Sequence, residues 1–145
     1  MKQYVLGFTF NYSLSQGLLI RKQRPDWQKG RLNGLGGKVE KAEEPLAAMI
    51  REYAEECGLV SVPAEWSYFA LLSGPHSQVH CFTAQMPLGT VFQTTDETLA
   101  TLTLPLPTEE KFCDHVEWLL ALARETIYIR DRGLKTPFTT MFCPN

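Results

Sequence analysis

Three glutamates in the first half of the chain have a spacing that could perform chemistry together. Glu52, Glu55 and Glu56 stand at positions i, i+3 and i+4, which places side chains next to one another on an α-helix. Like charges at this spacing destabilise a helix unless something neutralises them. Mg²⁺ and Mn²⁺ prefer such hard oxygen ligands, and Mg²⁺ commonly takes further ligands from substrate phosphates. The spacing therefore indicates a metal site for phosphate chemistry; the alternative is a solvated acidic helix face.

The segment around these glutamates has the pattern of an amphipathic helix. Over 45–57, the apolar residues form a stripe separate from the acidic one. Pro45 suits the first turn, and Gly58 is a typical helix stop. The glycine-rich stretch NGLGGK over 33–38 lies shortly before the helix, where glycines let the backbone approach a ligand or a metal ion. The sequence thus predicts a glycine-rich loop that leads into a helix carrying a row of carboxylates.

The same segment resembles the Nudix hydrolase family. Gly37, Glu43 and the run REYAEECGL over 51–59 match the Nudix box at its required spacing. The resemblance implies an α/β (α+β) fold, namely an α/β/α sandwich with a mixed β-sheet and a loop-helix-loop metal site. It also implies an enzyme that uses a divalent metal and water to cleave a nucleoside diphosphate linked to another group. Tyr53 stands where the family usually has an aliphatic residue, and we expect it to pack with its hydroxyl at the edge of the apolar stripe.

The resemblance also implies roles for individual residues, with Mg²⁺ or Mn²⁺ as cofactor. The implied metal ligands are the backbone carbonyl of Gly37 and the carboxylates of Glu52, Glu55 and Glu56. Arg51 matches the arginine that orients these carboxylates, and Glu43 matches the glutamate that supports the loop. In such a site a bound metal lowers the pKa of a water, and a carboxylate accepts the proton as the water attacks phosphorus.

Two acids outside the box are further candidates for the catalytic site. Asp96 and Glu97 lie in the polar loop predicted over 87–98, a region from which many members of the family supply another metal ligand or a base. We prefer Glu97. The alternative is that both are solvated loop acids.

Two short pieces resemble the branch of the family that hydrolyses oxidised purine nucleoside triphosphates. They are RLNGLGGK over 31–38 and VHCF over 79–82. The resemblance implies that Asn33 and Asp114, which precedes Trp118, hydrogen-bond the base, and Lys38 joins the expected substrate-binding residues. Trp27 lies in a loop with nearby cations and could stack on a base.

The alternatives to these roles are structural. Asn33 could adopt a left-handed turn geometry, and Asp114 could simply sit near a helix start. In a predicted strand, His80 is more typical of a structural than of a catalytic histidine.

These matches favour conversion of a nucleoside triphosphate, oxidised or not, to its monophosphate and pyrophosphate. ADP-ribose, nucleotide sugars and dinucleotide polyphosphates are alternative substrates. A Nudix-fold sensor that binds a nucleotide without cleaving it is a further alternative. The complete set of box glutamates favours an enzyme.

Length and composition are those of one domain spanning residues 1–145. The chain has a mass of 16.4 kDa, 44% hydrophobic and 21% charged residues, and a formal net charge of −2. This acidic balance argues against a stable nucleic-acid partner. The longest helical apolar run, over 118–123, is too short to span a membrane. The N-terminal residues do not have the pattern of a signal peptide. The cysteines at 57, 81, 113 and 143 are far apart and form no Cys-x-x-Cys pair. We therefore expect a cytoplasmic protein with reduced thiols.

The elements that must position the site follow from local pattern. Strands are predicted over 3–10, 17–22, 66–72, 79–86 and 99–106, and helices over 45–57 and 109–128. The segment over 24–37 reads as a loop and the tail over 130–145 as irregular. The tail could pack on the core or on a second chain, which makes a homodimer a further expectation. The order of elements predicts a mixed α/β sandwich.

Overall fold

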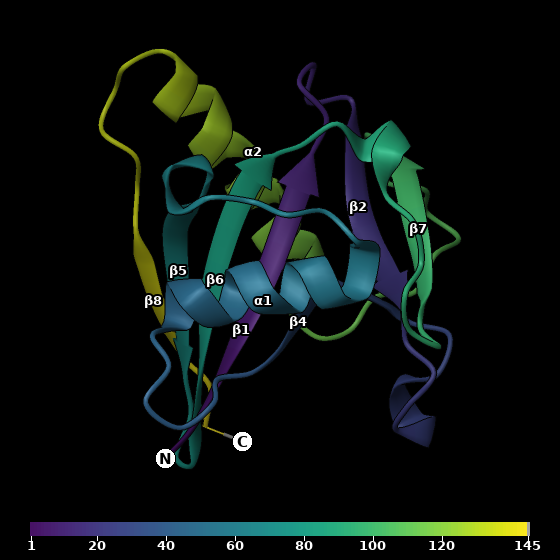
Figure 1. Ribbon diagram of the computed structural model, residues 1–145, viewed down its shortest axis with the longest axis vertical. Helices are drawn as coiled ribbons and strands as arrows, with labels where there is room; N and C mark the ends of the chain where they lie inside the picture. The colour runs from purple at the N-terminus through teal and green to yellow at the C-terminus, as the bar shows by residue number, and fades with distance from the viewer. Residues whose placement is uncertain (145) are drawn as a thin grey trace.

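Eight strands form one mixed β-sheet in the computed structural model, which describes residues 1–144 (Figure 1). The strands are β1 (Lys2–Phe10), β2 (Gln16–Arg21), β3 (Leu32–Asn33), β4 (Leu35–Lys38), β5 (Ser67–Ser73), β6 (Ser77–Gln85), β7 (Thr98–Thr103) and β8 (Thr139–Phe142). The main path runs β3-β2-β1-β6-β5-β8, with β4 beside β1 and β7 beside β2. The pairs β1–β6 and β5–β8 are parallel and the others antiparallel.

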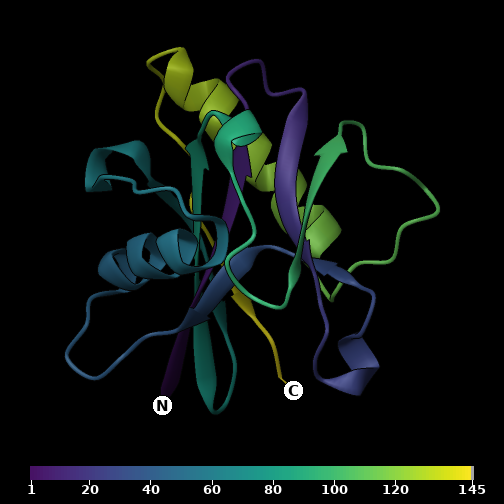
Figure 2. The ribbon, with the colours of Figure 1, turned by 45° about the vertical axis from the view of Figure 1, so that its right-hand side comes forward.

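Two helices cover opposite faces of this sheet (Figures 1 and 2). They are α1 (Pro45–Cys57) and α2 (Val116–Asp131), and short 3-10 turns form η1 (Asp26–Gln28), η2 (Pro63–Glu65) and η3 (Leu88–Thr90). Side chains alternate across a strand, so β1 contributes Val5 to the core beneath α1 and Phe8 to the core beneath α2. The predicted α/β/α sandwich with a mixed sheet is confirmed.

The sheet divides at β1, and this division creates the space for a site. The first half of β1 pairs with β4, with Gly7 opposite Leu35, whereas its end pairs with β2, with Phe10 opposite Gly17. Strand β2 then continues with β7. Residues of the two diverging parts, among them Ile20 on β2 and Gly36 on β4, line a common cavity.

The first helix has the predicted bounds, but the second begins later than predicted. Residues from Glu109 to His115 are not helical. Their backbone instead pairs with β3, because the Leu32 N–H donates to the Lys111 carbonyl and the Cys113 N–H donates to the Leu32 carbonyl (2.8 and 2.9 Å). The strand predicted to reach 106 ends at Thr103, shortly before prolines that cannot donate to a ladder.

Three strands, β3, β4 and β8, were absent from the sequence prediction, and β3 lies within the loop predicted over 24–37. Strand β4 lies within the predicted glycine-rich loop; a β-carbon at Gly36 would overlap the backbone of Val5, so glycine is what permits this close pairing. Strand β8 lies in the tail predicted to be irregular and pairs with β5, with Leu72 opposite Met141. The tail therefore packs on the core of its own chain.

Two further expectations concern membranes and cysteines. Within residues 1–144, none of the helices combines the length and the apolar character needed to cross a membrane. The four cysteines are free thiols, and three of them are buried.

Candidate active site

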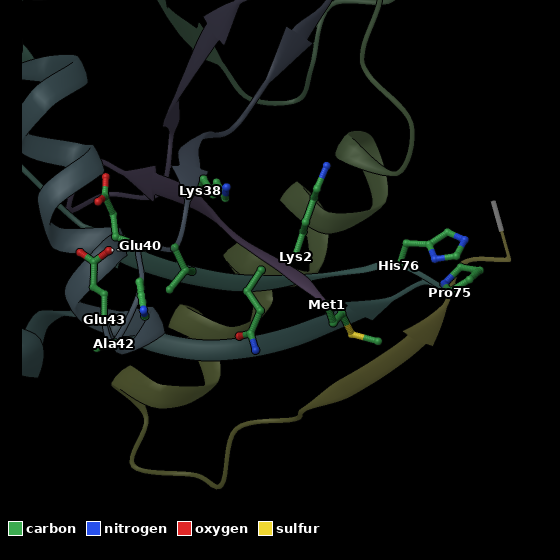
Figure 3. A pocket seen from close by; sticks show the side chains of 11 residues that line it. Met1, Lys2, Lys38, Glu40, Ala42, Glu43, Pro75 and His76 are labelled. Carbon is green, nitrogen blue, oxygen red and sulfur yellow. Dashed lines mark hydrogen bonds between the residues drawn. The ribbon is translucent and has the colours of Figure 1, made fainter.

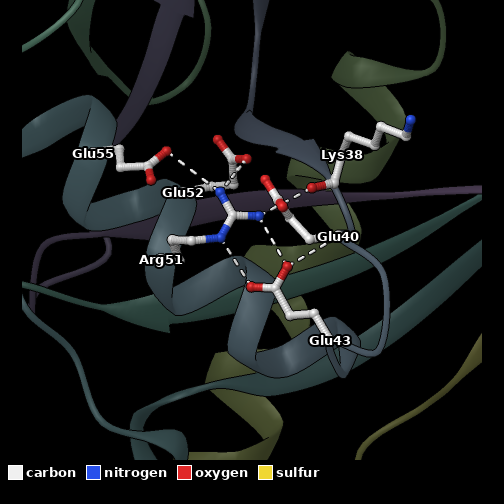
Figure 4. Close-up of polar contacts among 6 residues, drawn as sticks. All are labelled: Lys38, Glu40, Glu43, Arg51, Glu52 and Glu55. Carbon is white, nitrogen blue, oxygen red and sulfur yellow. Dashed lines mark hydrogen bonds and ion pairs between the residues drawn. The ribbon is translucent and has the colours of Figure 1, made fainter.

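Arg51 stands at the centre of an ion-pair network on α1 (Figure 4). Its Nε and Nη2 donate to the two carboxylate oxygens of Glu43 at 2.9 and 3.0 Å. Its Nη1 donates to Glu52 Oε1 at 2.8 Å and to Glu55 Oε2 at 3.4 Å. The planar guanidinium thus contacts three carboxylates at once and binds Glu43 through two hydrogen bonds in a fork that a lysine ammonium does not offer. The structure brings together Arg51 and the acids that the resemblance associates with it.

The same network fixes the loop before the helix. Arg51 Nη2 also donates to the carbonyl of Lys38 at 3.0 Å, and Glu43 Oε2 accepts the backbone N–H of Glu40 at 2.9 Å. Hydrogen bonds from Arg51 lower the pKa of Glu43 below its usual value. Glu43 therefore stays ionised and connects the loop to α1, the supporting position that the resemblance implies for it.

Gly37 faces Glu52 directly. A β-carbon built on Gly37 would overlap the carboxyl group of Glu52, so a side chain at 37 would displace this carboxylate. The pKa of Glu52 is raised by burial, while its contact with Arg51 acts in the opposite direction. The absent side chain thus lets the end of β4 approach an acidic residue on α1.

Glu56 is the most buried of the three glutamates, and the positive charge of Lys22 offsets only part of what opposes its ionisation. Its Oε2 has no hydrogen-bond partner within residues 1–144. Burial, followed by repulsion from Glu52 and Glu97, raises the pKa of Glu56 to about 8. A buried oxygen without a partner costs free energy, and a divalent cation would supply the missing positive charge. The hard oxygen donors of Glu52, Glu55 and Glu56 fit Mg²⁺ or Mn²⁺.

As the side chains stand, no group of three His, Cys, Asp or Glu residues in the described part of the chain converges to a metal site. Instead, Arg51 Nη1 holds Glu52 and Glu55, while Glu56 is turned toward the backbone of Gly36.

Glu97 lies next to this acidic group, whereas Asp96 points elsewhere. Glu97 accepts a hydrogen bond from Lys22 Nζ at 2.9 Å, and both side chains are mostly buried (16% and 20% exposed). Its charge also raises the pKa of Glu56. Asp96 pairs with Arg24 at 3.0 Å in an exposed contact (66% and 75%). Of the two acids, the structure therefore brings Glu97 to the box.

The loop that carries Glu97 is attached to the end of α1. The Phe92 N–H donates to the Cys57 carbonyl at 3.1 Å, and the Thr94 N–H donates to the Glu56 carbonyl at 3.3 Å. Gly58 ends the helix in the left-handed region, with φ of 78°. The helix stop visible in the sequence thus also makes room for the loop that brings Glu97 to the site.

The four expected substrate-binding residues line one cavity of about 510 Å³. Asn33, Asp114, Trp27 and Lys38 all border it, together with Gly37. Asp114 reaches this cavity because the chain before α2 pairs with β3. Asn33 and Asp114 are 81 positions apart in the sequence, so only the fold brings them together.

The alternative that Asn33 adopts a left-handed turn geometry is wrong. Asn33 lies in β3, opposite Ile20, and is not among the non-glycine residues with positive φ, which are Leu14, Ala42 and His115 in the described chain. Its Oδ1 accepts the N–H of Gly34 at 2.8 Å, which leaves its amide group free to donate.

Two other side chains have roles in packing. Tyr53 is fully buried, and its hydroxyl donates to Thr9 Oγ1 at 3.1 Å. The expectation that the hydroxyl reaches the edge of the apolar stripe is therefore wrong, because the space under β1 admits the whole side chain. His80 Nδ1 hydrogen-bonds the Tyr68 hydroxyl, and its Nε2 hydrogen-bonds Gln3 Oε1 (both 2.8 Å). His80 is therefore a structural residue, as expected.

Lys22 is a site residue that the sequence analysis missed. It borders the cavity, and its ammonium group is the cation nearest to Glu97 in the ion pairs of the described chain. A lysine at the end of a strand carries no motif by itself, so the only available signal was its position just after the apolar run of β2.

A second and more open cavity, of about 850 Å³, lies against the outside of the box loop (Figure 3). Glu40 and Glu43 stand at one end of it and His76 at the other. Lys38 borders both this cavity and the one with Asn33, so it lies at the connection between them.

Comparisons with known proteins agree with this geometry. The family model described as NUDIX domain matches residues 8–124, whereas comparison with curated proteins gives no match.

Three solved structures are similar in fold. A mutator MutT protein from Bacillus halodurans has a TM-score of 0.73 and 17% identity, covering 99% of this chain and 91% of its own. A MutT structure from work on Aliivibrio salmonicida and Vibrio cholerae has a TM-score of 0.70 and 22% identity, covering 83% and 97%. The NUDIX domain of Shewanella oneidensis NrtR, complexed with ADP ribose, has a TM-score of 0.68 and 18% identity, covering 86% and 87%.

The family match extends over most of the chain, from the end of β1 into α2, and it includes the residues of the acidic network together with Asn33 and Asp114 of the cavity beside it. The chain therefore belongs to the NUDIX domain family and is a Nudix hydrolase.

Proposed function

We propose that this protein is a divalent-metal-dependent pyrophosphohydrolase that converts a nucleoside triphosphate to its monophosphate and pyrophosphate. Members of its family act on nucleoside diphosphates linked to a further group. The observation that carries the narrower proposal is that Asn33 and Asp114 border the same cavity as Gly37. A base held by the first two residues would place its phosphates beside the box.

The proposed metal ligands are the carboxylates of Glu52, Glu55 and Glu56 and the carbonyl of Gly37. A bound Mg²⁺ or Mn²⁺ would neutralise the diphosphate and acidify a water. The unpartnered oxygen of buried Glu56 supports this assignment. Arg51 would hold Glu52 and Glu55 in place, and its contact with the Lys38 carbonyl would keep the loop in register with the helix.

Glu97, rather than Asp96, completes the proposed site as a further ligand or as the base that accepts the proton of the attacking water. Its burial and its closeness to Glu56 support this choice. Lys22 would hold the Glu97 side chain in position through its 2.9 Å hydrogen bond. Little covalent work is needed from the protein, since positioning and charge neutralisation carry most of the rate in phosphoryl transfer.

Asn33 and Asp114 are proposed to recognise the edge of a purine, including an oxidised one. An amide and a carboxylate present different donors and acceptors, so together they can distinguish purine edges. Trp27 would stack on the ring, and Lys38 would meet the phosphates.

The location of the protein in the cytoplasm and the formation of a homodimer stay predictions.

A product analysis tests the proposal. Purified protein is incubated with Mg²⁺ or Mn²⁺ and with ordinary and 8-oxo nucleoside triphosphates, ADP-ribose, a nucleotide sugar and a dinucleoside polyphosphate. We expect monophosphate and pyrophosphate from the triphosphates, and no turnover in EDTA. Faster cleavage of ADP-ribose would overturn the substrate assignment, while metal-dependent binding without turnover would identify a sensor.

A further inference from the structure

Strand β8 lies at an edge of the sheet. It ends the path β3-β2-β1-β6-β5-β8, and β5 is its only partner strand within residues 1–144 (Figure 1). Just after β8, the Cys143 N–H donates to the Ser73 carbonyl at 2.7 Å. Because the backbone groups of successive strand residues point to opposite sides of the strand, Thr140 and Phe142 direct theirs away from β5. The edge therefore offers unpaired donors and acceptors to a further strand.

The residues with outward backbone groups also have exposed side chains. Phe138, just before β8, and Phe142 are 50% and 69% exposed, and Thr140 between them is exposed as well. Thr139 and Met141, which alternate with them, are half-buried. The outer edge of β8 thus combines free backbone groups with two large apolar rings, a combination that favours pairing with another chain.

A row of aromatic rings leads across the sheet to this edge. The centroid of the Tyr68 ring lies 5.0 Å from that of Phe82 and 4.9 Å from that of Phe138. Phe82 is buried in the core and Tyr68 is 40% exposed, so exposure increases along the row towards Phe138. Phe142 takes part in none of the aromatic contacts of the described residues. One more ring on the outer side of β8 would continue the row.

Charge and area fit a second copy of this chain. The residues over 136–144 include no charged side chain, so two copies can meet there without repulsion although each has a formal net charge of −2. At roughly 200 Å² for a whole aromatic side chain, the exposed parts of Tyr68, Phe138 and Phe142 amount to about 300 Å² in each copy. The rings of both copies thus provide about half of the roughly 1,200 Å² that the smaller stable interfaces bury. The other half falls to the two strand backbones and Thr140.

We propose that two copies of this chain pair edge to edge through β8, in antiparallel orientation about a two-fold axis at Thr140. This axis pairs all three outward residues. Thr140 of each copy exchanges two backbone hydrogen bonds with Thr140 of the other, and Phe138 of each copy lies opposite Phe142 of the other. Phe142 of the second copy is then the ring that continues the row from Phe82. Pairing about a two-fold axis closes after two copies, and it does not depend on the hydrolytic assignment.

Analytical ultracentrifugation over a range of protein concentrations tests the dimer. We expect a species of twice 16.4 kDa, with a Kd of about 1–100 μM, as suits an interface of small area. Thr140→Pro should weaken dimerisation about tenfold or more, because it removes both N–H donors of the central pair. Proline is tolerated where the N–H of an edge strand faces solvent, so the melting temperature of the dilute monomer should not change. Thr140→Val is the matched control, since it retains the N–H and should still dimerise.

A second variant tests the same edge through a side chain. Phe142→Glu places a charge opposite the ring of Phe138 and should also leave a monomer at concentrations where the unmodified protein is dimeric. Val60→Glu, which changes another exposed apolar residue far from β8 in the sequence, should dimerise like the unmodified protein. Thermal melting of each variant verifies that it is folded.

Cysteine cross-linking tests the register. In a chain with Cys143→Ser, the three remaining native thiols are buried. Thr140→Cys in this chain should form a disulfide between copies under mild oxidation, because the α-carbons of such a pair lie about 5.5 Å apart, within the range of a disulfide. Thr101→Cys, at an exposed position of β7, is the control and should stay reduced under the same conditions.

Each outcome decides the proposal. A monomer at every concentration overturns it and leaves the edge to an extended segment of a different protein. A dimer that survives both Thr140→Pro and Phe142→Glu also overturns it, because the interface then lies elsewhere. Loss of the dimer in both variants without a cross-link at Thr140 overturns the register. Loss in both variants together with a cross-link at Thr140, and none at Thr101, supports pairing through β8.

Discussion

The α-carbon of Gly37 lies against the carboxylate of Glu52, with no room for a methyl group between them. This contact joins the end of β4 to the middle of α1, and it brings the two halves of the box motif together. It also explains in physical terms why this position requires glycine although its φ is not in the left-handed region: the reason is space rather than backbone conformation.

Gly37→Ala should therefore damage the site. The added methyl group has to displace the carboxyl group of Glu52, which is the end of a flexible side chain, so the cost in stability is small. We expect a melting temperature close to that of the unmodified protein and a loss of activity of about 10²-fold or more, because Glu52 is displaced from its position beside Arg51. Gly89→Ala is the control, since a β-carbon there meets no atom within 4 Å. Equal effects of the two changes would contradict the argument.

Glu56→Gln separates catalysis from stability. It keeps the shape of the side chain and removes a charge that burial and two neighbouring carboxylates oppose. Metal-dependent activity should fall by about 10²-fold or more, as expected when a metal ligand is lost. The melting temperature without metal should stay the same or rise. Glu125→Gln, an exposed glutamate on α2, should alter neither quantity, and near-normal turnover of Glu56→Gln would refute the metal assignment.

Glu97→Gln and Asp96→Asn form a matched pair of adjacent changes. Glu97 is buried with Lys22 beside Glu56, whereas Asp96 makes an exposed pair with Arg24. We expect kcat of Glu97→Gln to fall by about 10²-fold, the usual contribution of a positioned acid or base. Asp96→Asn should remain close to the unmodified protein, because exposed ion pairs contribute little. A larger loss in Asp96→Asn would reverse the assignment.

Asn33→Ala tests base recognition. Loss of the amide would leave a polar group of the base unpaired, at a cost of about 1–3 kcal/mol. We expect KM for the preferred purine to rise about tenfold and the preference between guanine-type and adenine-type triphosphates to decrease. The concentration of Mg²⁺ needed for half-maximal rate should not change, since the box is intact. Asn33→Gly should behave in the same way, because Asn33 has no left-handed geometry that glycine could preserve; a silent Asn33→Gly would exclude recognition by this side chain.

His80 predicts a dependence of stability on pH. Burial lowers the pKa of His80 below its usual value, so the unfolded chain binds a proton more readily than the folded one. This contribution to stability is complete above the unfolded pKa, at about 6.5, and is lost as the pH falls through the lower folded value. In urea unfolding at pH 7.5 and 5.0, His80→Gln should show a smaller loss of stability on acidification than the unmodified protein. His76→Gln, at an exposed position, serves as the control. Its loss of stability between pH 7.5 and 5.0 should match that of the unmodified protein.

The local sequence determined α1 and the row of carboxylates that it carries. The spacing of Glu52, Glu55 and Glu56, Pro45 at the first turn and Gly58 at the stop depend on interactions within a few residues, so α1 has the bounds predicted for it. The order of strands and helices also sufficed for the layered architecture, because each amphipathic element must bury one face.

Only the tertiary structure decided which distant residues complete the site. Hydrogen bonds from the loop to the end of α1 bring Glu97, and not its neighbour Asp96, to the box. Pairing of 111–113 with β3 overrides the helical pattern there and carries Asp114 to Asn33. Likewise, β8 forms because β5 offers it backbone partners. Such hydrogen bonds join segments far apart in the chain, and no local pattern of residue types encodes the partner.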